Sequence, residues 1–380
     1  MSRHGPFSFS RWWAMVLKEF LQLKRDRITF GMVVGIPLVQ LALFGYAINT
    51  DPKHMPTVVL AADRSEITRS FLAALEQSDY FRIVGEAPDE ASARAALARG
   101  EAVFVLNVPA NFTRDLLRGE RPALLVEADA TDPVATGTAL GAVEQIARSV
   151  ARKDAGGATG YLAAGEAPFR VHVHRLYNPE GSSRNNIVPG LMGVILTLMM
   201  VLMTGLAMTR ERERGTMENL LAMPVRPLEV MAGKIVPYVA IGLLQVTLIL
   251  LVAVFVFRVP FLGSLAALYL AALLFVAANL TVGITLSSLA KNQLQAMQMT
   301  VFYFMPNLLL SGFMFPFQGM PGWAQAIGNV LPLTYFNRLV RAIFLKGTPG
   351  WDLWPNVWPL MLFTAVVMAI AVKFYRKTLD

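Results

Sequence analysis

Six long apolar segments, none of which contains a charged residue, dominate this chain. A helix needs about 20 mostly apolar residues to cross a bilayer, and each segment reaches or approaches that length. The pattern therefore predicts six transmembrane helices, at Ile28–Ile48, Ile187–Met208, Ile235–Phe257, Phe261–Ala290, Leu294–Phe317 and Val357–Val372. The last segment is short, but it follows Trp351, Trp354 and Trp358, an aromatic belt typical of a membrane interface.

Residues 51–186 separate the first apolar segment from the other five and have the composition of a globular domain. Strand-like and helix-like stretches alternate there, which is typical of a small α/β domain with a mostly parallel sheet. The predicted strands are Thr57–Ala61, Phe81–Val84, Ala102–Val108, Ala123–Ala128 and Val171–Leu176. The predicted helices are Arg64–Gln77, Glu90–Arg99, Phe112–Arg118 and Pro133–Lys153. We therefore expect a polytopic α-helical membrane protein with an inserted α/β domain.

Composition agrees with a membrane protein, because 55% of the residues are hydrophobic and the mean hydropathy is +0.48. Residues 51–186 carry 15 Lys and Arg against 18 Asp and Glu, a net charge of −3, which leaves +11 for the rest of the chain. A basic charge in the apolar part indicates cytoplasmic flanks of membrane helices and no nucleic-acid binding. The chain has no cysteine, which excludes a disulfide framework.

The distribution of Lys and Arg predicts the orientation, because such residues collect in cytoplasmic loops. They precede the first apolar segment, fill the second-to-third connection, include Lys291 between the fourth and fifth, and follow the sixth. All four sets lie on the same side of the membrane only if the chain crosses it six times and both termini are cytoplasmic. The α/β domain then lies on the outer side of a bacterial inner membrane, and the first segment is an uncleaved anchor. Arg338, Arg341 and Lys346 break the pattern from the outer side.

Residues 1–27 contain an amphipathic stretch at Arg11–Asp26, with apolar residues on one side at helical spacing and charged residues on the other. Such a helix is expected to lie flat in the cytoplasmic interface. It serves either to position the first span or, as an elbow helix, also to contact a cytosolic partner. The residues singled out are Trp13, Leu17, Lys18, Glu19, Phe20 and Lys24.

Nothing in the sequence supplies energy for transport from within the chain. No phosphate-binding loop of the form Gly-x-x-x-x-Gly-Lys-Ser/Thr occurs, so we expect this chain to bind no cofactor and its energy to come from a separate subunit. The six spans contain no Asp, Glu, Lys, Arg or His, which argues against a proton- or sodium-coupled carrier. Their uncharged polar residues either pack helices together, which we favour for most, or line a substrate path; the path candidates are Gln40, Gln245, Asn279, Asn307 and Ser311.

The α/β domain offers little catalytic chemistry. His172 and His174 share a strand face, but no third ligand is evident, so we predict a solvated pair and no metal site. Asp129 and Asp132 lie at a strand-to-helix turn, where we expect helix capping. The domain is interpreted as a binding or docking module.

A charged, glycine-broken loop at 210–227 joins the second and third spans. Gly215 interrupts the helix, Thr216 caps a new short helix at Met217–Met223, and Pro224 ends it. The loop is either a rigid element with an apolar contact surface or a plain hairpin with a solvated rim, and these residues alone favour neither.

The stretch Glu211–Leu220, which reads ERERGTMENL, closely resembles the signature of type-2 ATP-binding-cassette (ABC) permeases. Met320–Trp323, Leu331–Tyr335 and Arg341 resemble the outer segment between the last two spans of that family. The resemblance implies the type-2 exporter fold and an outer re-entrant segment at 318–350, with Pro332, Tyr335, Arg338 and Arg341. It also implies a coupling element that contacts the ATPase and contains Glu211, Glu213, Arg214, Gly215, Thr216, Met217, Glu218, Leu220 and Leu221.

These observations predict the permease subunit of an ATP-driven exporter that moves amphiphilic, drug-like or lipid-like substrates. The expected partners are a dimer of cytosolic ABC ATPases, a second permease copy or a sister permease, membrane lipids and a periplasmic adaptor protein. An alternative is a membrane receptor or scaffold whose outer domain senses a ligand. A membrane enzyme is disfavoured, because no convincing nucleophile and base occur together.

Overall fold

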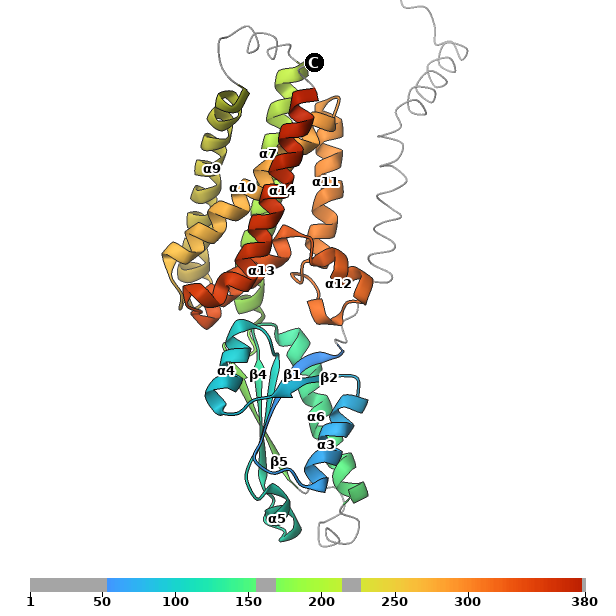
Figure 1. Cartoon of the computed structure of the whole chain (residues 1–380). Coiled ribbons are helices and arrows are strands. Elements are labelled where there is room, and N and C mark those ends of the chain that lie inside the picture. The colour runs from blue at the N-terminus through green and yellow to red at the C-terminus, as the bar shows by residue number, and fades with distance from the viewer. Residues whose placement is uncertain (1–52, 155–168, 214–226, 378–380) are drawn as a thin grey trace, which may run out of the picture.

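A computed structural model describes residues 53–154, 169–213 and 227–377. Figure 1 shows two parts stacked end to end: an α/β domain and a bundle of long helices. We call the end of the bundle that faces the α/β domain the domain end, and the opposite end the far end. The predicted first span, Ile28–Ile48, lies outside the described residues.

The α/β domain contains a five-stranded sheet in the order β2-β1-β3-β4-β5. All neighbouring strands are parallel except β3 and β4, which confirms the predicted, mostly parallel sheet. The predicted alternation of strands and helices is also confirmed. The elements are β1 Met55–Ala61, α3 Glu66–Gln77, β2 Phe81–Glu86, α4 Glu90–Arg99, β3 Phe104–Val108, α5 Phe112–Leu117, β4 Ala123–Asp129, α6 Pro133–Asp154 and β5 Arg170–Leu176.

Side chains alternate between the two faces of β3, as the pleat of a strand requires. Phe104 and Leu106 join the larger core, which α3 and α6 cover, whereas Val105 joins the smaller core beneath α4. Local signals set the ends of these helices: the Ser65 side chain caps α3, and Gly100 ends α4 with φ of +73°. The sheet therefore has helices on both faces.

The bundle contains four helical stretches long and apolar enough to cross a membrane among the described residues: Ser183–Arg210, Pro237–Val256, Leu265–Leu289 and Gly350–Ala371. They belong to the elements α7 Ser183–Glu213, α9 Pro227–Leu251, η2 Val252–Val256, α10 Leu265–Leu289, η5 Gly350–Leu353 and α14 Trp354–Lys377. The predicted start at Phe261 is wrong, because the Ser264 side chain caps α10. Helix α14 extends beyond both predicted ends.

The predicted fifth span, Leu294–Phe317, is wrong at its end. Helix α11, Gln293–Leu310, has only 18 residues, and Gly312 beyond it adopts φ of +76°. A left-handed residue cannot continue a right-handed helix, so the apolar run turns instead of continuing. It leads into η3 Phe317–Gly319, α12 Gly322–Gly328, α13 Pro332–Arg341 and η4 Ala342–Lys346, all at the domain end.

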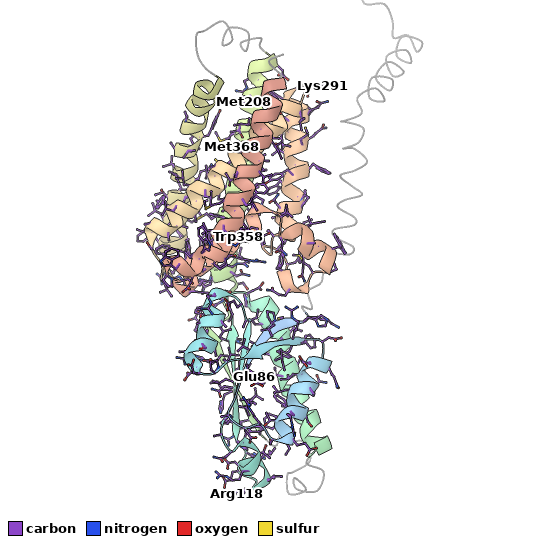
Figure 2. All side chains as sticks on the ribbon, in the orientation of Figure 1. Glu86, Arg118, Met208, Lys291, Trp358 and Met368 are labelled. Carbon is purple, nitrogen blue, oxygen red and sulfur yellow. The ribbon has the colours of Figure 1, made fainter. Side chains whose placement is uncertain are left out.

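The outside of the bundle is apolar, as a lipid-facing surface must be. Leu244, Leu248, Phe255 and Leu270 on α9, η2 and α10 are all more than 60% exposed. Trp351, Trp354 and Trp358 are exposed as well, and Figure 2 shows Trp358 toward the domain end. Their position is that expected of the predicted aromatic belt.

Candidate functional sites at the two ends of the bundle

At the far end, α7 finishes at Glu213, whose carboxylate is bound to the first residue of α11. Its Oε1 accepts a hydrogen bond from the Gln293 backbone N–H at 2.7 Å, and its Oε2 accepts one from Gln293 Nε2. The first N–H groups of a helix lack partners within the helix and attract negative charge. Glu213 therefore ties the stem of the 210–227 loop to the connection between α10 and α11.

The surroundings favour the ionised form of Glu213. The hydrogen bonds from Gln293 lower the pKa of this carboxyl, and the positive charge of Arg210 lowers it further. Asn292 caps the same helix by accepting from the Gln295 N–H at 2.8 Å, so two side chains satisfy the start of α11. Figure 2 shows Lys291, next to this cap, at the far end. The carboxylate is consequently charged whenever this contact exists at neutral pH.

The other predicted coupling residues are not placed by the structure. The backbone of Glu211 lies in the last turn of α7, and the seven residues Arg214, Gly215, Thr216, Met217, Glu218, Leu220 and Leu221 lie outside the described residues. The elbow residues Trp13, Leu17, Lys18, Glu19, Phe20 and Lys24 and the path candidate Gln40 also lie outside them. These assignments stay predictions.

The remaining path candidates separate into two groups. Asn279 and Asn307 are fully buried, and each amide donates to a carbonyl one turn back in its own helix, Asn279 to Phe275 and Asn307 to Tyr303. Gln245 is half-buried on α9, with its Oε1 unpaired among the described residues. Ser311 differs, because it accepts a hydrogen bond from Asn337 of α13 at 3.4 Å. Among the described path candidates, Ser311 thus has a hydrogen bond to the outer segment.

At the domain end, α12 and α13 form a compact pair. Pro332 begins α13, the Thr334 hydroxyl donates to the Gly328 carbonyl at 2.6 Å, and the Tyr335 hydroxyl donates to the Asn329 carbonyl at 2.5 Å. The buried face of α13 is fixed by Phe336, which stacks on Phe275 of α10 with ring centroids 4.1 Å apart. Helix α13 is thus packed on α10, and two hydrogen bonds join it to the end of α12.

The polar face of α13 carries Arg338 and Arg341, one turn apart. The Arg338 guanidinium lies 4.7 Å from the centre of the Phe317 ring, and Arg341 donates to the Gly312 carbonyl at 3.1 Å. Both side chains point into the junction with the α/β domain, since both line the same cavity there. The structure thus brings together Ser311, Arg338 and Arg341, which the sequence had assigned to separate groups.

The sequence did not predict the contact that joins the two parts. Lys346 Nζ lies 2.6 Å from Asp129 Oδ2 and donates to the Leu97 carbonyl at 2.9 Å, with the Tyr177 ring centre 5.1 Å away. Both charged side chains are about nine-tenths buried. Burial raises the pKa of Tyr177 to about 12, and the charges of Asp129 and Glu127 add to the effect. The only sequence signal was that Lys346 breaks the charge rule.

The expectation for Asp129 was wrong. Asp129 ends β4 and does not cap α6, which begins four residues later at Pro133. Its second oxygen, Oδ1, accepts from the Thr131 N–H at 3.1 Å, which turns the chain out of the strand and aims the other oxygen at Lys346. Of the two predicted histidines, His174 lies 3.6 Å from the buried Glu127. No group of three potential metal ligands occurs within the described residues.

Comparison with known proteins gives the family. The model of the ABC-2 family transporter protein matches residues 27–373. The probable multidrug ABC transporter permease YbhS of Escherichia coli (strain K12) is 31% identical over 374 residues, which cover 97% of each chain. From the same organism, the probable multidrug ABC transporter permease YbhR is 26% identical over 97% of this chain and 99% of its own, and the inner membrane transport permease YhhJ is 29% identical over 96% of each. A match of this extent shows that the chain belongs to the ABC-2 family of transporter proteins, as a membrane permease and not as a catalytic subunit.

Proposed function

We propose that this chain is the permease subunit of an ATP-driven exporter, which moves amphiphilic, drug-like or lipid-like substrates out of the cytoplasm or the inner membrane. Family membership implies association with an ABC ATPase. The multidrug designation of YbhS and YbhR supports substrates of the proposed kind. The transporter would contain two permeases, as two copies or as a pair with a sister permease, and a dimer of ATPases that binds ATP and Mg²⁺.

The observation that carries the coupling step is the bond between Glu213 and the start of α11. An ATPase that displaces the 210–227 loop would also displace Glu213 at the end of α7. The hydrogen bonds between Glu213 and Gln293 would transfer this displacement to α11. Helix α11 leads directly to Ser311 and the α12–α13 pair at the other end of the bundle. A rigid helix of this kind carries a displacement across the bundle, which is the motion that alternating access requires.

The proposed topology has six crossings, with the undescribed Ile28–Ile48 as the first and α11 as the fifth. Both termini and the 210–227 loop would face the cytoplasm, and the α/β domain would face outward from a bacterial inner membrane. The Lys346–Asp129 contact supports this arrangement, because it joins η4, which directly follows α13, to the α/β domain. Arg338 and Arg341 would then be groups of the outer mouth. The outer domain would be the site for a periplasmic adaptor.

The coupling claim is tested by the double substitution Glu213→Ala and Glu218→Ala in the full chain, purified with its ATPase. We expect substrate-stimulated ATP hydrolysis to fall by roughly 5- to 150-fold, the range of typical coupling energies between sites. The matched control is Glu120→Ala, an exposed acid in the α/β domain. The assignment of the loop is wrong if the double variant keeps both ATPase association and stimulated hydrolysis.

One observation favours a second function, a receptor or scaffold in which the outer domain senses a ligand. The buried contact of Lys346 with the domain would transmit a movement of that domain to α13. The ATPase measurement separates the two functions, because a receptor of this kind would not stimulate hydrolysis in response to a transported substrate.

A further inference from the structure

Two cavities lie in the junction between the α/β domain and the α12–α13 pair. The first measures about 240 Å³, and its lining includes Arg99, Asp129, Ser311, Arg338, Arg341 and Thr348. The second measures about 730 Å³, and its lining includes Lys53, His54, Arg82, Phe317, Met320 and Arg338. Arg338 and Phe317 line both cavities. The two spaces therefore meet at one guanidinium.

The second cavity is cationic. Lys53, Arg82 and Arg338 line it together with His54, and none of the described residues that line it is acidic. Lys53 has a distant ion pair with Asp79 at 3.9 Å, and both side chains are about half exposed, so solvent screens that pair strongly. A cavity walled by one sign of charge concentrates ions of the opposite sign. The expected occupant of this space is an anion.

The first cavity contains carboxylates, and two of them already have a basic partner or neighbour. Asp129 is paired with Lys346, and Arg99 is paired with Glu101 by two hydrogen bonds. Asp132 and Asp352 also line this cavity, and the charges of Asp132 and Asp129 act on Arg341. Arg338 also faces the second cavity, where no acidic residue is among the described lining residues, so its charge is available to a ligand there.

The two guanidiniums are held in place and are incompletely satisfied. Arg338 lies between the rings of Phe317 and Tyr335, at 4.7 and 5.8 Å from their centres. Arg341 uses one terminal nitrogen on Gly312, while its buried Nε has no hydrogen-bond partner among the described residues. The buried Thr348 hydroxyl, in the same cavity, also lacks one. Leaving buried donors unpaired is costly, and a planar guanidinium binds phosphate or carboxylate through two parallel hydrogen bonds.

The neighbourhood is suited to an apolar chain attached to such an anion. Met320 and Phe317 line the second cavity beside Arg338, and α12 continues from there with Trp323 and Ile327, each 45% exposed. Trp351 of η5 and Trp354 and Trp358 at the start of α14 are exposed, and Trp358 lies toward the same end of the bundle, as expected at a membrane interface. A free inorganic anion gains nothing from these apolar side chains, whereas the apolar chain of an amphiphile can pack against them.

We propose that the junction binds the anionic headgroup, a phosphate or a carboxylate, of an amphiphile at the outer membrane interface, with Arg338 and Arg341 as its ligands and Arg82 facing it from the α/β domain. The apolar part lies along α12. The inference that this site is the exit of the export route rests on the proposed function, but binding itself requires no ATPase.

The test is native mass spectrometry of the full chain in detergent, titrated with a short-chain phosphatidic acid, with the diacylglycerol of equal chain length, and with inorganic phosphate. We expect phosphatidic acid to bind at least tenfold more tightly than either comparison ligand. Arg338→Gln and Arg341→Gln should each weaken its binding by tenfold or more. Arg118→Gln, at the exposed tip of the α/β domain (Figure 2), is the matched control and should change nothing.

Because Arg341 also bonds to Gly312, its variant could lose the fold, so Arg82→Gln provides an independent measurement. Arg82 is exposed on β2, and we expect its loss to weaken binding about threefold or more. Equal binding of diacylglycerol, or unchanged binding in folded Arg338→Gln and Arg82→Gln proteins, would overturn the proposal. If inorganic phosphate binds as tightly as phosphatidic acid, the ligand is a free anion, and the proposal of an amphiphilic ligand is wrong. Since no ATP is present, failure of ATPase coupling leaves this result standing.

Discussion

Lys346 is the residue that joins the two parts of this molecule, and its surroundings explain why the contact is stable. It donates to a carboxylate and to a carbonyl in the last turn of α4, and its charge also lies near an aromatic ring. A helix C-terminus carries a partial negative charge that adds to the attraction. Such a site contributes rigidity as long as both charges are present, because removal of one leaves the other buried and unpaired.

Lys346→Met should therefore destabilise the chain by about 3–5 kcal/mol, the typical cost of breaking a buried ion pair from one side. The double variant Lys346→Met with Asp129→Leu removes both charges and should recover much of that loss. The measurement is thermal unfolding in detergent by differential scanning fluorimetry. A single variant as stable as the parent chain, or a double variant no better than the single, would contradict a buried, mutually dependent pair.

This pair also shows where sequence reasoning stops at the residue scale. Capping was expected of Asp129 because an acid after a strand and before a helix often has that role, and only its three-dimensional partner decides otherwise. That partner is 217 positions away, so no local pattern connects the two residues. The unusual charge of Lys346 on the outer side was visible in the sequence, but its compensation was not. Pro332, which the resemblance assigned to the outer segment, begins α13, a position where a proline is favoured by its own backbone geometry.

Helix α13 is the element on which the junction depends, and glycines let it approach the bundle. A Cβ on Gly193 of α7 would come within 2.5 Å of Leu333 Cδ1 and 2.9 Å of Phe336 Cδ1. The α7 and α13 backbones are therefore close only because position 193 has no side chain. Small residues serve the same purpose in membrane helix pairs generally.

Gly193→Ala should destabilise the chain by about 1–3 kcal/mol, the usual cost of overpacking a well-packed contact. Gly137→Ala, in α6, is the matched control, because a Cβ there meets nothing within 4 Å. That substitution should be neutral or stabilise the chain by about 0.5–1 kcal/mol, since alanine favours a helix over glycine. Equal melting temperatures for the two variants would mean that α7 and α13 are not closely packed.

The elements themselves could be predicted wherever the hydrophobic period was clear. The sheet followed from short alternating stretches between turn residues, and the long helices followed from uninterrupted apolar runs. The predicted end of the fifth span was wrong, because the apolar sequence continues past Leu310 but the helix ends there. Hydrophobicity indicates burial or lipid contact. It does not reveal that Gly312 adopts a left-handed conformation, which many other glycines do not adopt. Apolar length alone therefore cannot separate a straight span from a shorter helix followed by a packed pair.

The whole molecule is a transporter permease with chemically different ends. The far end presents Glu213 and the capped start of α11, whereas the domain end presents half-buried arginines and an α/β domain. The proposed mechanism needs these ends on opposite sides of the membrane. The ATPase acts from the cytoplasm. A site that receives headgroups at the exit of the export route must lie on the outer side of the membrane.

The absence of cysteine from the sequence makes this arrangement directly measurable, since any introduced cysteine is the only one present. Glu120 and Lys291 are both exposed, in the α/β domain and at the far end of the bundle respectively, so neither substitution disturbs packing. In intact cells, a membrane-impermeant maleimide should label the Glu120→Cys protein nearly completely and the Lys291→Cys protein only after lysis. Labelling of both proteins in intact cells would mean that the two ends lie on the same side of the membrane. The Glu213 tie could then not convey force across a bilayer, and the export mechanism would fail with it.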